Sequence, residues 1–309
     1  LVSSAKFSPQ NASLLAFTGI KYWPIWLAMG FLRLITFLPW SVGKKFGPAL
    51  GYLLYQLSKR RRGITEKNIA TCFPKLDQQQ QYNLVLQTFY ANGTGVIETA
   101  YAWWSSLKPF NKHIQIDGLE ALQEACDSEQ GVLLLGAHFT SPDLGCALLN
   151  QHQPFSVTYQ RHKNPLMDAL ILRGRSHCLG GAIERDQIRQ VVKTLKDGQT
   201  VWLAPDQDLG PDRSVFAHFF GIPTATTAIA SRLAKSTQCR VFFFSHQQRN
   251  NQSYHLQLIP LDKLPSGEEA QDAAIINSQI EEAVRQYPAQ YLWLHRRFKT
   301  RPHGSPEIY

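Results

Sequence analysis

The sequence predicts an α/β protein: a central, largely parallel mixed sheet flanked by helices, preceded by an N-terminal membrane helix. Short apolar runs of strand length recur along the chain, and amphipathic helical patterns separate most of them. A third observation is a stretch of nineteen residues near the start that holds a single charge. We divide the 309 residues, 44% of them hydrophobic, into a membrane anchor at 1–42 and one larger domain at 43–309.

The N-terminal stretch from Tyr22 to Trp40 reads YWPIWLAMGFLRLITFLPW. Its length matches a hydrocarbon core of about 30 Å, and tryptophans lie near both ends, as interfacial aromatic residues do. Because Arg33 interrupts it near the middle, a helix lying in the interface is the alternative to a spanning one. No small-residue cleavage site follows, which argues against a removed signal peptide. The basic residues at 44–45 and 59–62 place the C-terminal side of the anchor in the cytoplasm.

The elements of the larger domain follow from periodicity and turn residues. Three helices are expected before the sheet: over about 43–58, after the polar run 77–81, and over about 92–106. Strands are expected at 131–137, 154–159, 200–204, 240–245 and 254–259. Helices are expected near 142–150, 165–177, 186–197, 224–236 and 268–286. The last two strands, with Asn250-Asn251 between them, predict a hairpin.

Charge and cysteine content narrow the class of function. Lys and Arg number 32 against 23 Asp and Glu, a net charge of +9 that suits nucleic acid, anionic lipid or a phosphorylated substrate. The five cysteines are scattered without a CxxC pair. This argues against a disulfide framework and a structural zinc site, and it favours a reducing compartment.

The stretch GVLLLGAHFTSPDLG, residues 131–145, holds the first candidate site. Ser141 and Pro142 are a favoured N-cap and first helical residue, so a helix begins just after His138. His138 then lies at the carboxyl end of a strand, where open α/β sheets bind their ligands. Asp143, in the first helical turn, is expected to accept a hydrogen bond from Nδ1 of His138. That bond would leave Nε2 of His138 as a general base.

The alternative is a structural role for both residues, with His138 satisfied by backbone groups and Asp143 a second cap. An isolated HxxxxD pattern is weak by itself. The chain has no GxSxG nucleophile motif and no HExxH zinc motif. A base without a protein nucleophile indicates activation of a hydroxyl on the substrate, and therefore direct transfer.

Four segments together resemble the lipid A secondary acyltransferases, the lauroyl and myristoyl transferases of the lysophospholipid acyltransferase superfamily. They are GAHFTSPD at 136–143, TYQRHKNPLMDALILRGR at 158–175, WLAPDQDLGPDRSVFAHFFG at 202–221 and PAQYLWLHRRFKTRP at 288–302. The resemblance covers most of the chain, and the four blocks occur in the family's order. It departs at Asp143, where many lauroyl-type members have Glu, and at Gln160-Arg161, where many members place Arg directly after Tyr.

The resemblance implies transfer of a fatty acyl group from acyl carrier protein to a 3-hydroxyacyl chain of a phosphorylated disaccharide lipid of the Kdo2-lipid IVA type. His138 is then the base, Asp143 steadies the imidazolium, and Arg175 is the donor to the oxyanion. No cofactor or metal is implied beyond the acyl carrier protein that carries the donor. The implied partners are acyl carrier protein, the anionic glycolipid and membrane lipids, at the cytoplasmic side of a bacterial inner membrane.

The same resemblance implies the substrate-binding residues. They are Arg161, Asn164, Arg185, Asp206 and Asp208. Arg296 and Arg297 are predicted separately, as a surface patch for the anionic acceptor or for acidic acyl carrier protein, because basic residues crowd at 296–301. Arg185 suits a phosphate or carboxylate because a guanidinium makes bidentate hydrogen bonds, although a salt bridge to a neighbouring carboxylate is a close alternative. The two aspartates are expected to organise the pocket. An aromatic set, Trp103, Trp104, Phe219 and Phe220, is expected either to line an acyl channel or to pack in the core.

Two other functions remain in view. A glycerolipid acyltransferase shares the His–Asp chemistry, but its usual Glu-Gly-Thr-Arg acceptor block is replaced here by Pro205-Asp206-Gln207-Asp208. A nucleic-acid-binding protein would place its basic patches on a known module, which the sequence does not show, and would leave the apolar N-terminal stretch unexplained.

Overall fold

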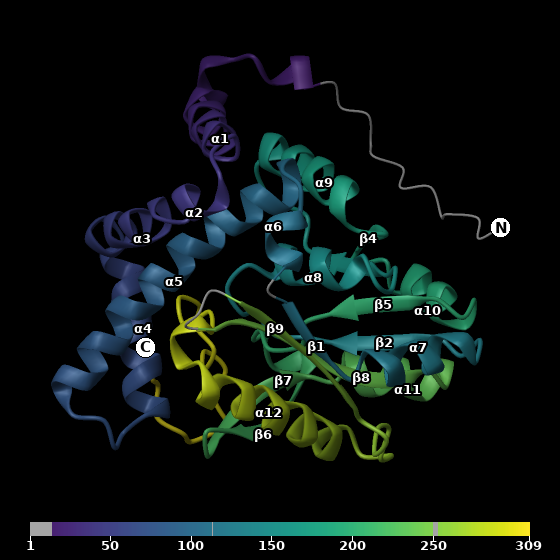
Figure 1. Cartoon of the computed structure of the whole chain (residues 1–309). Coiled ribbons are helices and arrows are strands. Elements are labelled where there is room, and N and C mark those ends of the chain that lie inside the picture. Colours follow the sequence, from purple (N-terminus) through teal and green to yellow (C-terminus); the bar gives the residue numbers. More distant parts are fainter. Residues whose placement is uncertain (1–13, 113, 250–252) are drawn as a thin grey trace.

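The structure, a computed structural model, describes residues 14–112, 114–249 and 253–309. Within these residues the chain forms a seven-stranded sheet in the order β1-β9-β8-β2-β5-β3-β4 and a separate two-stranded sheet, β6-β7 (Figure 1). The strands are β1 (Ile114–Asp117), β2 (Val132–Leu135), β3 (Ser156–Tyr159), β4 (Gly181–Glu184), β5 (Thr200–Leu203), β6 (Ser214–Phe219), β7 (Ile222–Thr227), β8 (Arg240–Gln248) and β9 (Tyr254–Pro260).

Helices cover both faces of the large sheet. The α-helices of the described residues are α1 (Trp23–Ile35), α2 (Trp40–Gly43), α3 (Phe46–Leu57), α4 (Lys59–Cys72), α5 (Gln78–Trp104), α6 (Lys108–Asn111), α7 (Leu119–Asp127), α8 (Pro142–Asn150), α9 (Pro165–Cys178), α10 (Ile188–Lys196), α11 (Ile229–Thr237) and α12 (Glu269–Gln286).

The predicted largely parallel mixed sheet is confirmed. β2 pairs in parallel with β5 and β8, and β3 pairs in parallel with β5 and β4. β8 and β9 form the predicted antiparallel hairpin, with Phe244 opposite Leu258. The Asn250-Asn251 pair expected at its turn lies outside the described residues.

The core has two halves because successive side chains of a strand point to opposite faces of the sheet. Leu133 and Leu135 of β2 pack in one half, with α10, α11 and α12. Val132 and Leu134 pack in the other half, with α7, α8 and α9. The strand that leads to His138 is therefore fully buried on both faces.

Local signals set the helices close to the candidate site. α8 begins with Pro142 after Ser141, as the sequence predicts, but the Ser141 side chain makes no capping hydrogen bond. α9 begins with Pro165, and the side-chain oxygen of Asn164 accepts hydrogen bonds from the first backbone N–H groups. Asp77 caps α5 in a capping box, and α5 runs unbroken for 27 residues, so the two helices predicted between 77 and 106 are one.

The sequence interpretation did not include β1, β4 or the β6–β7 hairpin. The hairpin turns at Phe220-Gly221, where both residues have positive φ, the conformation of a tight type I′ connection. The helix predicted at 224–236 begins only at residue 229, because the threonine-rich run at 224–227 pairs with β6 instead.

The stretch from Tyr22 to Trp40 does not form the single long helix that the spanning alternative requires. α1 has 13 residues and ends at Ile35, and the chain then turns before α2 starts at Trp40. At about 1.5 Å per residue, α1 is too short for a hydrocarbon core of about 30 Å. None of the helices in the described part of the chain is long and apolar enough to span a bilayer. Arg33 donates a hydrogen bond of 2.7 Å to the carbonyl of Trp104 at the end of α5, which explains a charge in this apolar stretch.

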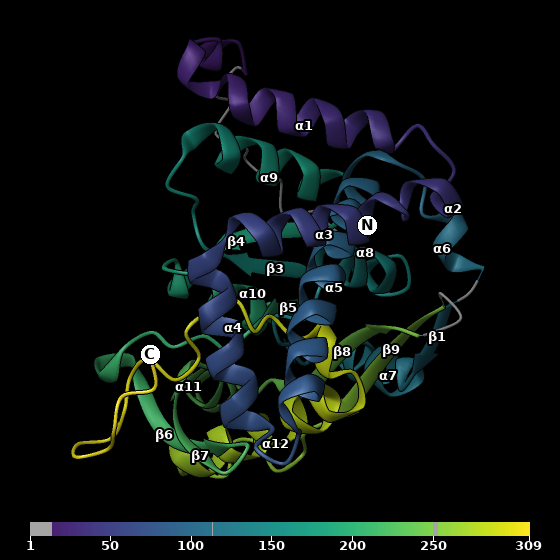
Figure 2. The same ribbon diagram turned by 90° about the vertical axis from the view of Figure 1, so that its left-hand side faces the viewer.

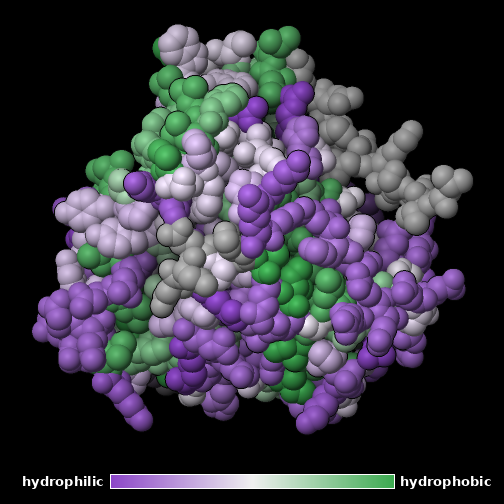
Figure 3. All heavy atoms as spheres, in the orientation of Figure 1, coloured by the Kyte–Doolittle hydropathy of each residue, from purple (hydrophilic) through white to green (hydrophobic). Residues whose placement is uncertain are grey.

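Helix α1 lies over α9, at the end of the molecule opposite the β6–β7 hairpin (Figure 2). Hydrophobic side chains gather on the surface over α1 (Figure 3). The first 13 residues of the proposed anchor at 1–42 lie outside the described residues, and the division into anchor and catalytic domain stays a prediction.

Candidate active site

His138 lies in the loop between β2 and α8, beside the segment that follows β5. β2 and β5 are parallel neighbours whose register pairs Leu135 with Leu203, so both chains leave the sheet at the same edge. Three residues beyond these ends, His138 and Asp206 meet. This edge, at the carboxyl ends of parallel strands, is where open α/β sheets bind ligands.

Asp206 holds both the backbone and the ring of His138. Its Oδ2 accepts a hydrogen bond of 2.9 Å from the His138 backbone N–H, and its Oδ1 lies 2.6 Å from Nδ1 of the ring. The Asp206 side chain is fully buried, whereas 28% of the His138 side chain is exposed. The carboxylate therefore fixes the ring from the interior and leaves the opposite side accessible.

His138 and Asp206 each stabilise the charged form of the other. Burial by itself lowers the pKa of His138, but the charge of Asp206 and the hydrogen bond outweigh it, so the pKa is raised above its ordinary value. Burial likewise acts to raise the pKa of Asp206, and the contacts with His138 overcome this and hold it far below the ordinary range. Asp206 is thus ionised at neutral pH, and Nδ1 of His138 carries the proton that is donated to it.

The other ring nitrogen, Nε2, then carries a lone pair. Nε2 of Gln207 lies 3.1 Å away, so the amide N–H donates to the ring. Gln207 also lines a cavity of about 680 Å³ between α10 and α11, which Arg185, Arg213 and Arg232 border as well. A proton acceptor therefore lies one side chain away from a cavity of ligand size.

The predicted hydrogen bond from His138 to Asp143 is wrong. Oδ2 of Asp143 accepts a bond of 2.8 Å from the indole N–H of Trp103, and Oδ1 accepts from Nε of Arg175 at 3.0 Å and Nη2 at 2.8 Å. Asp143 sits in the first turn of α8 and faces α5 and α9, whereas Nδ1 of His138 turns towards the end of β5. Arg175 lies partly buried against Asp143, with 20% of its side chain exposed, and its role as oxyanion donor stays a prediction.

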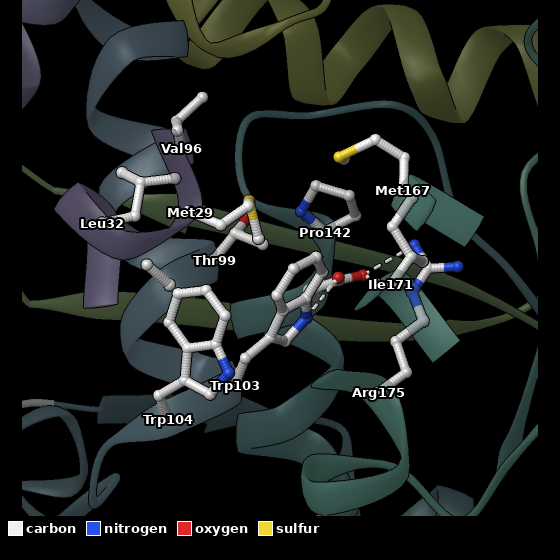
Figure 4. A pocket seen from close by; sticks show the side chains of 12 residues that line it. Met29, Leu32, Val96, Thr99, Trp103, Trp104, Pro142, Met167, Ile171 and Arg175 are labelled. Carbon is white, nitrogen blue, oxygen red and sulfur yellow. Dashed lines mark hydrogen bonds and ion pairs between the residues drawn. The ribbon is translucent and has the colours of Figure 1, made fainter. Parts of the chain in front are cut away.

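Asp143 and Arg175 are the charged residues of a second, largely apolar pocket of about 320 Å³ (Figure 4). Its other lining residues come from α1, α5, α8 and α9: Met29, Leu32, Val96, Thr99, Ala100, Trp103, Trp104, Pro142, Met167 and Ile171. Of the aromatic residues left open by the sequence, the two tryptophans line this pocket, while Phe219 and Phe220 are buried in the core. The loop 138–143 therefore reaches one cavity beside His138 and another at Asp143.

The residues predicted to bind substrate in the second block have local partners. Arg161 is exposed, with its Nε 3.6 Å from Asp168. Asn164 uses its side-chain oxygen as the N-cap of α9. Both lie at the start of α9, and neither lines the two cavities described above.

Arg185 and Asp208 are placed differently from each other. Arg185 follows β4 and borders the larger cavity, and its Nε is buried without a hydrogen-bond partner among the described residues. Asp208 accepts hydrogen bonds from the backbone and hydroxyl of Thr300, at 2.6 and 2.8 Å, and from the backbone of Gly210. Asp208 thus ties the β5 loop to the C-terminal segment, and Asp206, predicted as a pocket organiser, holds the base itself.

The two arginines predicted as one exposed patch have opposite environments. Arg296 is exposed, and its guanidinium lies over the ring of Tyr309. Arg297 is 1% exposed and donates to the carbonyl of Ala225 at 2.7 Å and to the side chains of Thr226 and Asn277. The expectation of a surface cluster is wrong for Arg297, because the apolar segment around it is folded into the core.

The sequence interpretation missed the carboxylate partner of His138 and the amide at Nε2. Asp206 is 68 residues from His138, and only the register of β2 with β5 brings the two together. The position of the Pro205-Asp206-Gln207 run just after a strand was the available signal. The described residues contain no group of three or more His, Cys, Asp or Glu side chains that would hold a metal ion.

Comparison with known proteins decides the family. The model of the bacterial lipid A biosynthesis acyltransferase family matches residues 13–300. The chain belongs to this family. The lipid A biosynthesis lauroyltransferase of Escherichia coli (strain K12) is 34% identical over 292 residues, which cover 94% of this chain and 95% of that protein.

Two other family members from the same bacterium carry different acyl names. The lipid A biosynthesis palmitoleoyltransferase is 34% identical over 94% of this chain and 95% of its own length. The lipid A biosynthesis myristoyltransferase is 25% identical over 94% of this chain and 91% of its own length. The resemblance seen in the four sequence blocks is confirmed, and the protein is an acyltransferase of this family.

Proposed function

We propose that this protein transfers a fatty acyl group from acyl carrier protein to a 3-hydroxyacyl chain of a lipid A precursor of the Kdo2-lipid IVA type. The observation that carries the proposal is the pairing of His138 with buried Asp206, which leaves the lone pair of Nε2 beside a cavity. Membership of the lipid A acyltransferase family supports the class of acceptor.

In the proposed reaction the acceptor hydroxyl replaces the Gln207 amide at Nε2 of His138. Nε2 takes the hydroxyl proton while the oxygen attacks the thioester carbonyl, and Asp206 stabilises the imidazolium that forms. The tetrahedral intermediate then collapses, the new ester remains on the acceptor, and the departing thiolate takes the proton from His138. No covalent acyl-enzyme intermediate and no metal take part.

We assign to the Asp143–Arg175 pair the stabilisation of the tetrahedral intermediate, and to the pocket beside it the binding of an acyl chain. The carboxylate of Asp143 fixes the orientation of the Arg175 guanidinium, and a donor to a developing oxyanion requires a fixed orientation. Beside it, the apolar pocket of Figure 4 offers walls for methylene groups of one substrate's acyl chain. Trp103 fixes Asp143 from the other side and so keeps this pair in place.

The apolar surface over α1 and α3 supports an interfacial location rather than a spanning one. Its exposed side chains include Leu27, Phe31, Leu34, Leu53 and Leu57. The basic residues Lys45, Lys59 and Arg60 are exposed next to it, as for a surface that lies on anionic lipid. We propose that this surface rests on the cytoplasmic face of a bacterial inner membrane. Exposed Arg296 and Arg185 at the larger cavity remain proposed contacts for phosphates or for acidic acyl carrier protein.

The function is tested by offering the purified enzyme acyl-acyl carrier protein with either a tetra-acylated disaccharide acceptor or lysophosphatidate. We expect mass spectrometry to show one added acyl group on the disaccharide and none on lysophosphatidate. Transfer to lysophosphatidate alone would establish the glycerolipid alternative instead. Lipid A from cells with and without the gene, compared by mass spectrometry, should differ by the same acyl group. Oligonucleotide binding without any acyl transfer would refute both enzyme assignments.

A further inference from the structure

Behind the loop that carries His138 and Asp143 lies a buried carboxyl group that the proposed reaction does not use. Glu98, on α5, is 3% exposed, and its carboxylate accepts a hydrogen bond from the hydroxyl of Tyr254 on β9. It borders a small enclosed cavity of about 10 Å³, together with Ser141, Thr140 and His246. A void of this size has room for about one water molecule.

The loop in front of Glu98 is held in an unusual conformation. Ser141 has φ 58° and ψ 54°, the left-handed region that residues other than glycine rarely adopt. Its hydroxyl is buried, lines the same cavity and makes no hydrogen bond to any residue that the structure describes. Ser141 lies between His138 and Asp143, so its backbone conformation sets the course of the chain from one residue to the other.

Close packing transmits the position of α5 to this loop. A Cβ at Gly95, one turn before Glu98, would lie 2.9 Å from the backbone nitrogen of Ser141. On the other side, Nε2 of His246 donates a hydrogen bond of 2.9 Å to the carbonyl of Thr140. The loop is therefore fixed from β8 by a histidine, while on the α5 side Trp103 holds Asp143, Gly95 packs on Ser141 and the Glu98 carboxylate faces the small cavity.

Among the groups that face this cavity, only Glu98 changes charge near neutral pH. Burial raises the pKa of Glu98 to about 7, against the opposing hydrogen bond from Tyr254. Burial lowers the pKa of His246 on β8 to about 4, and burial raises the pKa of Tyr254 on β9 well above its ordinary value. Both of these groups are neutral at pH 7, so the hydroxyls of Tyr254 and Ser141 are the donors available to an ionised Glu98.

We propose that Glu98 is a positioning residue: its carboxylate, accepting from Tyr254 and from Ser141 directly or through one water, holds the left-handed turn and so aligns His138 and Asp143. The inference rests on the proposed role of His138 as base. The ionised carboxylate is the active form, because only that form accepts hydrogen bonds on both oxygens.

The test compares Glu98→Gln with Asp272→Asn as a matched control. Asp272 is also a buried carboxylate, but it accepts from Ser231 and Ser266, which are outside the loop 138–143, and it does not line the cavity beside Glu98. We expect Glu98→Gln to lower kcat about tenfold with KM unchanged, and Asp272→Asn to leave both constants within about twofold.

The pH profile separates alignment from folding. In the wild type both His138 and Glu98 must lose a proton, so the acid limb of log kcat/KM against pH should approach a slope of two. In Glu98→Gln only His138 titrates, and the slope should fall to one. If Glu98→Gln keeps the kcat and the slope of the wild type, the inference is wrong. It is also wrong if the variant has a lower melting temperature and an unchanged slope.

If Glu98→Gln does not fold, Ser141→Ala removes the other partner without changing the packing of α5. It should lower kcat at least threefold at constant KM, and full activity of this variant also overturns the inference. Absence of acyl transfer by the wild type would instead refute the proposed function. Transfer that depends on His138 but not on Glu98 or Ser141 refutes the positioning role alone.

Discussion

His138 and His255 each form a 2.6 Å contact with an aspartate, yet the two pairs are built in opposite ways. In the first pair the carboxylate of Asp206 is fully buried and 28% of the histidine side chain is exposed. In the second pair the histidine side chain is 7% exposed and Asp117 is 48% exposed. The short contact is therefore common to both and does not distinguish a base from a structural residue.

The position of each pair in the sheet explains the difference. His138 and Asp206 follow the ends of two adjacent parallel strands in the middle of the sheet. His255 lies within β9 and pairs with Asp117 of the edge strand β1. Only the first arrangement leaves a ring nitrogen at the edge of the sheet where ligands bind, beside Gln207 and its cavity.

The largest expected effect comes from removing each histidine in turn. His138→Ala should lower kcat about a thousandfold, because a general base contributes roughly 10²–10⁴-fold. His255→Ala should keep kcat within about threefold, because its ring does not reach the cavity. Acyl transfer measured by mass spectrometry, with thermal melts to confirm folding, checks both variants. Near-normal turnover by His138→Ala would contradict direct transfer with this histidine as base.

The fold was largely predictable from local sequence signals. Apolar runs indicate strands such as β2, and Pro at the first helical position after a residue of capping type indicates helices such as α8 and α9. All of these signals act within a few residues. The β6–β7 hairpin was missed because its threonine-rich second strand leads directly into α11, and the two patterns were read as one helix. The length of an apolar stretch, likewise, did not show that α1 ends at Ile35 and turns.

The candidate site was only half predictable, for a physical reason. That His138 ends a strand is a local fact, whereas the identity of its carboxylate depends on which strand lies next to β2. Local spacing suggested Asp143, five residues away, but the parallel pairing with β5 brings Asp206 to the ring. Arg297 shows the same limit: its charge suggests a surface, and only the tertiary structure shows the carbonyl and hydroxyl groups that surround it.

Neutralising the two aspartates sharpens the comparison further. Asp206→Asn should lower kcat about a hundredfold, because Asn cannot stabilise the imidazolium as a charge does, while Asp117→Asn should have almost no effect on kcat. The pKa of His138 is raised above its ordinary value, and the base acts in its neutral form. Activity of the wild type should therefore fall as the pH drops through a value above about 6.5, the ordinary pKa of histidine.

In Asp206→Asn the acid limb of kcat/KM should move to lower pH, because the charge that raised the pKa of His138 is gone. Asp117→Asn is the control, and its acid limb should coincide with that of the wild type. An unshifted limb in Asp206→Asn would mean that another group controls this ionisation.

The smallest effect is expected for the contribution of the His255–Asp117 pair to the free energy of unfolding. A hydrogen bond from Gln115, followed by one from His255, lowers the pKa of Asp117. A depressed carboxyl pKa adds stability above the unfolded value of about 4, and this stability is lost as the pH falls through the folded pKa. Because Asp117 is half exposed, solvent screens its charge, and Asp117→Asn should cost at most about 1 kcal/mol of unfolding free energy at pH 7.

Urea unfolding of the wild type and Asp117→Asn at pH 7, with and without 1 M NaCl, measures this term. The difference between the two proteins should shrink in salt, because the Debye length falls to about 3 Å, and it should also shrink as the pH is lowered below about 4. Turnover should stay at the wild-type level throughout. If Asp117→Asn instead lowers kcat while its unfolding free energy is unchanged, the second pair takes part in the reaction, and exposure of the histidine ring is not what separates the base from its structural counterpart.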